Sequence, residues 1–179
     1  MDLKYSIRKW YVRFLVRMGK AIDIKLYGRY PADVLSNVKG NHFVIDGVEC
    51  GSMEAFLQSL KREDVEMQRQ IAILKGRDAR KSATTSWRAT QTLWWKGQPM
   101  QRQSDEFYEL LQRAYEALYQ QSARFRMGLH ASKGKRLFHT HGSNDPTKTI
   151  LTEKEFCRLL TELRDRHADE VLFGMGKRH

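Results

Sequence analysis

Cysteine and proline are scarce in this chain, and long apolar runs are missing. It has two cysteines and three prolines among 179 residues. Cys50 and Cys157 do not have the spacing of a metal site, and nothing in the sequence pairs them as a disulfide, so we expect two buried thiols in a cytoplasmic protein. No apolar run approaches the ~20 residues of a membrane span, and the N-terminus lacks the pattern of a secretory signal. We therefore expect no membrane partner.

The signatures of several common enzyme classes are also missing. The sequence has no glycine-rich phosphate loop, no H-E-x-x-H zinc motif and no G-x-S-x-G elbow of a serine hydrolase. His139 and His141 are two residues apart and have no third ligand nearby in sequence, which favours a polar loop and leaves a metal site as the alternative. We expect neither a metal nor a cofactor.

Acidic residues are outnumbered by basic ones. The chain contains 32 lysines and arginines against 21 aspartates and glutamates, which gives a formal charge of +11. A protein with this balance attracts polyanions, either nucleic acid or a phosphorylated small molecule. The alternative is a basic surface that only keeps the protein in solution.

Hydrophobic periodicity predicts one α+β domain over residues 1–179, predominantly helical with a small β-hairpin or sheet. Residues 3–20 are expected to form a basic amphipathic helix. Its large apolar residues are Ile7, Trp10, Phe14, Leu15 and Met18. We expect this helix to pack on the core of the domain; the alternative is that it lies on an anionic surface.

Turn and cap signals organise the first half of the chain. Alternating residues in 21–27 predict a short strand. The pair Asp46-Gly47 between apolar residues predicts a tight hairpin. Ser52 is a candidate N-cap for the helix that follows, and a further helix is expected over 65–74.

Similar signals mark the second half. Ser104 is expected to cap a long helix whose apolar stripe belongs to the core. Thr152 and Glu155 form a capping box before the last helix. Residues 128–145 are expected to be loop-rich and basic, and residues 173–179 to be frayed.

The segment from Ser52 to Lys61 is the most informative part of the sequence. On a helix, four of its residues form one apolar stripe: Met53, Phe56, Leu57 and Leu60. Three others form a polar stripe: Glu54, Gln58 and Lys61. At about 100° per residue the polar stripe flanks the apolar face, so it is placed to line a cleft. The alternative is a row of solvated side chains.

One carboxylate among aromatic and cationic residues suits a nucleotide-sugar substrate. Glu54 follows the hairpin directly, and Trp94 and Trp95 stand in a later polar stretch that can fold over it. A carboxylate stabilises positive charge that develops on an anomeric carbon, while aromatics stack on a base and cations hold phosphates.

Three motifs, in this order and spacing, resemble the NADAR family, whose name marks an association with NAD and ADP-ribose metabolism. They are L-S-N at 35–37, F-V-I-D-G-V at 43–48 and S-x-E-x-x-x-Q-x-x-K at 52–61. They are similar to the family's F-S-N-like loop, its apolar hairpin and its S-x-E-H-x-x-Q-x-x-K helix.

Later positions extend the resemblance over roughly residues 33–164. D-A-R at 78–80 looks like the family's A-K segment, with Arg80 in place of lysine. The L-x-x-S-x-G-x-x-L stretch at 129–137 is similar to its L-x-x-T-G-x-x-L turn, and Asp145 stands where the family has an aspartate before the final helix.

Several positions depart from the family pattern. Ala55 replaces the histidine after the glutamate, and Leu35 replaces the aromatic residue of F-S-N. Gln103 stands where the family has a tryptophan, and Thr147 and Thr149 stand in place of its W-G element. The chain resembles a divergent member, so its substrate can differ from that of better-known members.

The resemblance implies an N-glycosidase. Some members cleave phosphorylated riboflavin-pathway intermediates, and others remove ADP-ribose from guanine bases in DNA. Glu54 would be the catalytic carboxylate at the bond between ribosyl C1″ and nitrogen. The substrate-binding residues that the resemblance implies are Ser36, Asn37, Gln58, Lys61, Arg80, Trp95 and Asp145.

Each of these binding residues has an ordinary structural alternative. Ser36 and Asn37 can form a turn stabilised by side-chain to backbone hydrogen bonds. Trp95 can belong to the core, Arg80 can be solvated, and Asp145 before a proline can start a turn.

Charge decides between the two activities of the family. Broad positive charge benefits binding to a polymer, so we expect the substrate to be ADP-ribosylated guanine in nucleic acid. The alternative within the family is a phosphorylated riboflavin-pathway intermediate. The alternative of another class is a non-catalytic module that binds ADP-ribose or nucleic acid. No obligate protein partner is inferred.

Overall fold

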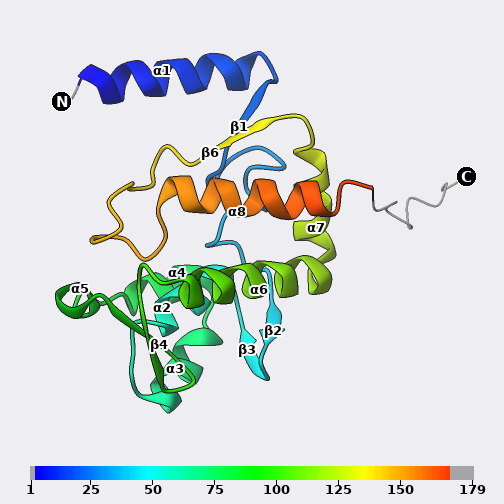
Figure 1. The fold of residues 1–179 in the computed structure, drawn as a ribbon. Coiled ribbons are helices and arrows are strands. Elements are labelled where there is room, and N and C mark those ends of the chain that lie inside the picture. The colour runs from blue at the N-terminus through cyan, green and yellow to red at the C-terminus, as the bar shows by residue number, and fades with distance from the viewer. Residues whose placement is uncertain (1–2, 170–179) are drawn as a thin grey trace, which may run out of the picture.

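A computed structural model describes residues 3–169, with side chains from Ser6 onward, so the expected fraying of residues 173–179 lies outside the described part. The described chain is an α+β domain in which helices dominate and the strands are short (Figure 1). In chain order the elements are α1 (Leu3–Arg17), β1 (Ala21–Asp23), β2 (Phe43–Ile45), β3 (Val48–Cys50), α2 (Met53–Ser59), α3 (Val65–Ala72), α4 (Gly76–Lys81), α5 (Trp87–Thr90), β4 (Thr92–Trp95), β5 (Gln98–Gln101), α6 (Asp105–Gln121), α7 (Ala123–Ala131), β6 (Arg136–Phe138) and α8 (Glu153–Arg166).

The strands form three separate pairs. β2 and β3 make the antiparallel hairpin that the Asp46-Gly47 signal predicts, and both turn residues have positive φ, at 49° and 78°. β4 and β5 form a second hairpin around Lys96 and Gly97, again with positive φ at both positions. β1 pairs in parallel with β6, which comes more than a hundred residues later in the chain.

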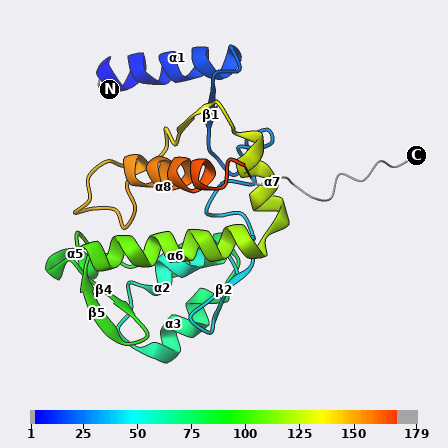
Figure 2. The same cartoon turned by 45° about the vertical axis from the view of Figure 1, so that its right-hand side comes forward.

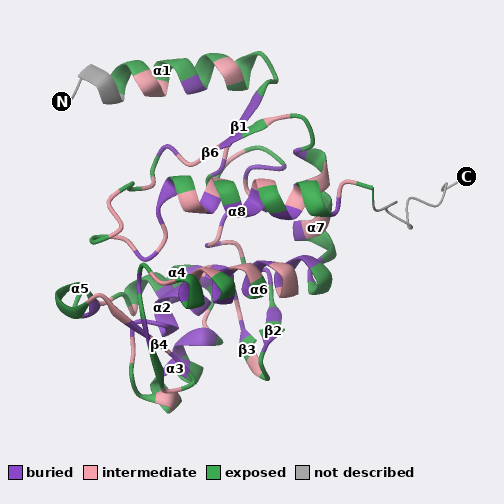
Figure 3. Ribbon diagram, in the orientation of Figure 1, coloured by how far each residue is buried: buried purple, intermediate pink, exposed green. Residues whose placement is uncertain are grey.

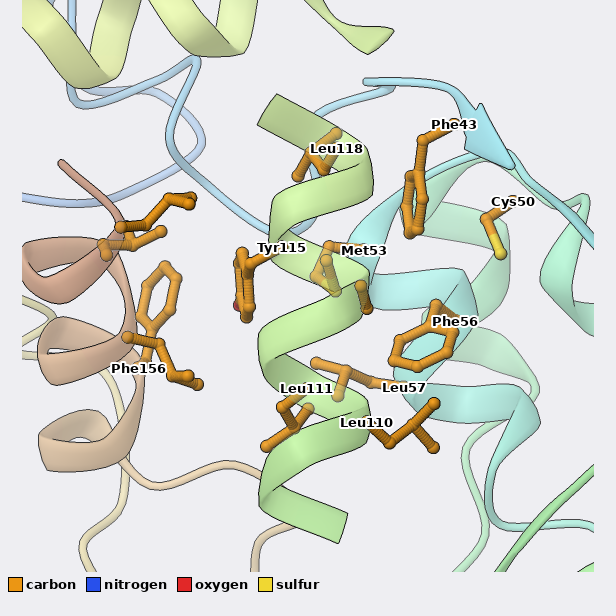
Figure 4. Close-up of a cluster of buried hydrophobic side chains, with 14 of the residues drawn as sticks. Phe43, Cys50, Met53, Phe56, Leu57, Leu110, Leu111, Tyr115, Leu118 and Phe156 are labelled. Atoms are coloured by element: carbon orange, nitrogen blue, oxygen red, sulfur yellow. The ribbon is translucent and has the colours of Figure 1, made fainter. Parts of the chain in front are cut away.

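The long helix α6 is the centre of the core. Ser104 caps it, since its hydroxyl accepts a hydrogen bond from the Phe107 amide at 3.2 Å. Figure 4 shows the apolar stripe of α6 packed between Phe156 of α8 on one side and Phe56 of α2 on the other. The expectation that this stripe belongs to the core is confirmed. Its buried members are Phe107, Leu110, Leu111, Ala114, Tyr115 and Leu118.

Helix α2 is enclosed on almost every side. Ser52 accepts a hydrogen bond from the amide of Ala55 at 3.1 Å and begins the helix as its N-cap. Every residue of α2 is buried except Glu54, which is half-buried. Ala55, which stands at the histidine position of the NADAR motif, is completely buried. A single carboxylate therefore opens outward from a helix that otherwise belongs to the core.

The prediction that residues 128–145 are loop-rich is confirmed for most of that stretch, with two exceptions. Helix α7 continues to Ala131, and the strand β6 follows at Arg136–Phe138. Gly128 lies inside this helix. The position requires glycine because a Cβ there would come within 2.3 Å of Val34 Cγ2. β6 is fixed by pairing with distant β1, which a local pattern does not reveal.

Helix α1 stands at the edge of the fold in both Figure 1 and Figure 2. Of its described side chains, Val12 alone is buried, while Leu15 and Arg8 are half-buried. Trp10 and Phe14, which we expected to face the core, are exposed. Figure 3 shows much of α1 in the green of exposed residues. Among residues 3–169, no helix has the length and apolarity that crossing a bilayer requires.

Neither described cysteine is paired. Cys50 is buried as expected, whereas Cys157 is only half-buried, and both are free thiols. Burial raises the pKa of each thiol to about 12, so neither supplies a thiolate near neutral pH.

Gly76, the first residue of α4, is packed against the backbone of Val38, and a Cβ there would lie 2.3 Å from the Val38 carbonyl oxygen. We expect Gly76→Ala to lower the free energy of unfolding by about 1–3 kcal/mol, because backbone must move to admit the methyl group. Gly40→Ala is the control, since nothing lies within 4 Å of a Cβ at that position. Urea denaturation measures both; equal stability of the two variants would contradict the close packing at Gly76.

Candidate active site

A polar cleft of about 370 Å³ lies where α2, α4 and α5 face the loop between β6 and α8. Gln91, just after α5, donates a hydrogen bond to the Thr147 carbonyl at 3.2 Å and ties this loop to the other wall. In Figure 1 the loop lies on the same side of the molecule as α5. The cleft is lined by Asn37, Glu54, Leu57, Gln58, Lys61, Arg80, Arg88, His139, His141, Gly142, Ser143, Lys148, Thr149, Ile150, Leu151 and Phe156.

Glu54 is held firmly at this cleft. Its backbone amide donates to the Asn37 carbonyl at 2.9 Å, and the buried residues on both sides of it fix the helix that carries it. Its side chain is 14% exposed. Oε1 accepts a hydrogen bond from Gln58 Nε2 at 2.9 Å, and among the described residues Oε2 has no hydrogen-bond partner. One carboxylate oxygen is thus oriented by the protein and the other is left for a ligand.

Gln58 and Lys61 form a chain of hydrogen bonds that ends at the Glu54 carboxylate. Lys61 Nζ donates to Gln58 Oε1 at 2.8 Å, and because an ammonium group cannot accept, the Gln58 amide must turn its NH₂ toward Glu54. Lys61 is 9% exposed. Burial lowers the pKa of Lys61 to about 8, with nearby Arg88 and Arg62 acting in the same direction and Glu54 opposing them. The three residues of the predicted polar stripe are therefore together.

Cations dominate the rest of the cleft. Arg80 of α4 places Nε 3.9 Å from Glu54 Oε1 while its side chain remains mostly exposed, so it neighbours the carboxylate without enclosing it. Arg88 of α5 and Lys148 of the β6–α8 loop line the same space. Four cationic side chains, counting Lys61, share the cleft with one carboxylate. Such a site attracts phosphate groups.

Asn37 is also brought to the cleft. Tyr115 of α6 donates a hydrogen bond from its hydroxyl to Asn37 Oδ1 at 2.8 Å. Complete burial raises the pKa of Tyr115 well above its ordinary value, so the hydroxyl keeps its proton. The side-chain oxygen Oδ1 of Asn37 is thereby occupied, and the side-chain nitrogen Nδ2 has no hydrogen-bond partner among residues 3–169. This amide group is left to donate to a ligand.

Three predicted binding residues do not line the cleft. Ser36 is buried in a turn, where its backbone bonds to Asp33 and Lys39. Trp95 belongs to the core: its indole Nε1 donates to Asp46 at 2.8 Å, and its ring meets Phe56 edge-on. Trp95 therefore fits its structural alternative as a core residue, and Ser36 lies in a turn that backbone hydrogen bonds close.

Asp145, the third of them, starts a turn. Its Oδ1 accepts hydrogen bonds from the Thr147 amide at 3.0 Å and the Thr147 hydroxyl at 2.6 Å, and Oδ2 lies 3.3 Å from Lys148. It shapes the loop that carries Lys148 and Thr149 into the cleft, but does not line the cleft itself.

Several cleft residues were not predicted as binding residues, among them Arg88, His139 and Lys148. His139 Nδ1 lies 2.7 Å from the Ile24 carbonyl oxygen, and because that oxygen only accepts, Nδ1 carries the proton. In the neutral ring, Nε2 is then an acceptor. Within residues 3–169, no group of three His, Cys, Asp or Glu side chains is placed to hold a metal ion. Of these three residues only His139 had a local signal, the H-x-H pattern at 139–141.

The charge of Lys61 predicts a pH dependence of binding. With a pKa of about 8, Lys61 is cationic at neutral pH and loses its proton as pH rises. We expect KM for a phosphorylated substrate to rise several-fold between about pH 7 and about pH 9, because only about a tenth of a group remains charged one unit above its pKa. Lys61→Met removes this pH dependence, whereas Lys148→Met, which removes an exposed cation of the cleft, weakens binding and retains it. A KM that is flat in the wild type over this range would contradict a role for the Lys61 charge.

Comparison with known proteins places the chain in a family. The family model described as bacteriophage protein GP30.3 matches residues 29–165. An uncharacterized 17.1 kDa protein in the Gp30-rIII intergenic region of Enterobacteria phage T4 is 41% identical over 147 residues, which are 80% of this chain and 97% of that protein. The NMR structure of the E. coli protein YbiA has a TM-score of 0.59 at 19% identity, covering 89% of this chain and 92% of that one, and shows that the two proteins share a fold. The chain belongs to the bacteriophage GP30.3 family.

Proposed function

We propose that this protein is an N-glycosidase that hydrolyses the bond between ribosyl C1″ and a base nitrogen in an ADP-ribosyl adduct. The observation that carries the proposal is the position of Glu54. It is the one residue of α2 that is not buried, and it opens into a cleft lined by four cationic side chains. The NADAR-like fold shared with YbiA supports the same class of reaction.

The chemistry follows from the charge that develops during bond cleavage. As the C1″–N bond breaks, the base leaves with the electron pair and takes up a proton, while positive charge grows on C1″ and the ring oxygen. The free oxygen of Glu54 stabilises that charge from one face of the sugar, and water then adds to C1″. The products are ADP-ribose and the unmodified base, which stays attached to its own nucleotide; the proton that the base takes up is balanced by the proton that water loses. Gln58 and Lys61 keep the carboxylate oriented throughout, so no reorganisation is needed at the moment of reaction.

Substrate binding is assigned to the surrounding polar groups. Arg80, Arg88 and Lys148 attract the phosphates, and the Asn37 amide is a donor for a ribose hydroxyl. The volume of about 370 Å³ falls within the range of ligand sites, about 300–1,000 Å³. We further propose ADP-ribosylated guanine in nucleic acid as the substrate, because the formal charge of +11 benefits binding to a polyanion.

The test is a comparison of products from three substrates. Purified protein is incubated with a guanine-ADP-ribosylated oligonucleotide, with free ADP-ribosyl guanosine and with a phosphorylated riboflavin-pathway intermediate, and the products are separated by chromatography. We expect ADP-ribose to be released most rapidly from the oligonucleotide. Turnover of the riboflavin intermediate alone would overturn the substrate assignment and retain the reaction class. Salt-dependent oligonucleotide binding without any product would instead identify a binding module.

A further inference from the structure

Helix α1 carries an apolar stripe that the fold leaves uncovered. Ile7, Trp10, Tyr11 and Phe14 are all exposed, Trp10 to 67%, and they stand at i, i+3, i+4 and i+7. Trp10 and Phe14 stack on each other with ring centroids 5.9 Å apart and an interplanar angle of 11°. Met18, exposed in the turn after the helix, continues the same face. Scattered exposed apolar residues are ordinary, but a continuous stripe of this kind marks an interaction surface.

The core holds α1 by a different face. Val12 is buried, Leu15 is half-buried, and Arg8 forms an ion pair with Glu153 at the start of α8. On a helical projection these contacts are centred about 120° away from the exposed stripe. The helix is thus fixed to the domain while its stripe points outward. Figure 2 shows α1 set apart from the other helices after rotation, as in Figure 1.

Positive charge borders the stripe. The sequence of α1 contains no acidic residue. Arg13 and Arg17 project next to the stripe on one side, are exposed, and make no ion pair among the described residues. A surface that complements α1 therefore has an apolar layer for the aromatic side chains and negative charge beside it.

We infer that the outward face of α1 binds an anionic lipid surface. The stripe inserts into the boundary between headgroups and acyl chains, and Arg13 and Arg17 contact the lipid phosphates. Duplex nucleic acid would satisfy the arginines but leave Ile7 and Phe14 in water. A second copy of this chain would bring the arginines of two α1 helices toward each other.

This inference is independent of the proposed reaction. None of the stripe residues lines the cleft, and α1 lies outside the residues 29–165 matched by the family model. The binding is peripheral, so it adds an anchor to the domain without a membrane span. The inference departs from the expectation of no membrane partner and takes up the alternative stated for residues 3–20, a helix that lies on an anionic surface.

Co-sedimentation with vesicles tests the inference. We expect the wild type to sediment with vesicles of phosphatidylglycerol and phosphatidylcholine, to do so less as salt is raised, and to remain in solution with phosphatidylcholine alone. Trp10→Ser/Phe14→Ser lowers the partition coefficient by about tenfold or more. Met67→Ser/Ile73→Ser is the matched control: it removes two exposed apolar residues around α3, and partition is unchanged.

The arginines and the fold are tested separately. Arg13→Glu/Arg17→Glu reduces binding to the anionic vesicles, and unchanged thermal melting of all variants shows that folding is not the cause. Lack of sedimentation with anionic vesicles at low salt would overturn the inference. So would equal binding to neutral vesicles, or equal loss in the Met67/Ile73 control. A dimer in light scattering that Trp10→Ser/Phe14→Ser dissociates would also overturn it, by showing that a second copy covers the stripe.

Discussion

Glu54→Gln is expected to lower kcat about a thousandfold while leaving the fold unchanged. The amide retains the shape of the side chain and an oxygen for the hydrogen bond from Gln58, but it carries no negative charge. Because the positive charge on C1″ exists mainly in the transition state, losing the carboxylate raises the barrier with little effect on substrate binding. Single-turnover release of ADP-ribose measures the chemical step directly.

A nearby glutamate provides the control for this variant. Glu63 lies shortly after α2, is exposed, and does not line the cleft. Glu63→Gln removes the same charge from the same part of the chain, and we expect kcat to remain at the wild-type value. Full activity of Glu54→Gln, with the control equally active, would refute the assignment of the catalytic carboxylate.

Arg102→Met is expected to have the largest effect on stability. The Arg102 side chain is 2% exposed; it forms paired hydrogen bonds to Glu155 at 3.1 and 2.7 Å and donates through Nε to the Thr149 carbonyl at 3.1 Å. Removal of the guanidinium group leaves the Glu155 carboxylate and the Thr149 carbonyl without this hydrogen-bond donor. We expect the free energy of unfolding to fall by about 3 kcal/mol. Since Thr149 lines the cleft, KM should rise as well.

Urea denaturation of Arg102→Met and Arg158→Met separates this effect from the loss of any arginine. Arg158 is exposed and pairs with Glu162 at 3.6 Å, so its removal is expected to change stability by no more than about 1 kcal/mol. Similar losses in both variants would contradict the special role of Arg102.

The pH dependence of the free energy of unfolding is a second test of the Arg102–Glu155 ion pair. Burial disfavours the charged form of Glu155, but hydrogen bonds from Arg102 and Thr152 outweigh that effect and lower its pKa. The resulting stabilisation is present above the ordinary pKa of a glutamate and is lost as pH falls through the lowered value. Arg102→Met should therefore show a smaller loss of stability on acidification than the wild type.

Local signals in the sequence predicted much of the fold. The Asp46-Gly47 turn, the Ser52 and Ser104 caps and the Thr152 capping box with Glu155 all occur as expected. Each of these depends on hydrogen bonds or backbone angles within a few residues, which a pattern in the sequence encodes directly. β6 and the glycine within α7 depend on contacts with β1 and Val34, distant in the chain, so the local pattern suggested a loop.

The residues of the candidate site likewise fall into those that local spacing predicts and those that depend on contacts distant in the chain. Glu54, Gln58 and Lys61 share one helical face, so their spacing was sufficient to predict that they lie together. The opposite wall, with Arg88, His139 and Lys148, comes from a short helix and a long loop that only the folded chain brings near α2. Trp95 shows the reverse case: an aromatic residue in a polar stretch suggested a stacking surface, but its hydrogen bond to Asp46 holds it in the core.

A crystal structure of the Glu54→Gln variant grown with ADP-ribose tests the central claim most directly. The account predicts that the distal ribose occupies the cleft, with C1″ within about 4 Å of the residue 54 side chain and the phosphates contacting Arg80, Arg88 or Lys148. Density for the nucleotide on another surface, or an empty cleft in a variant that binds ADP-ribose in solution, would contradict it.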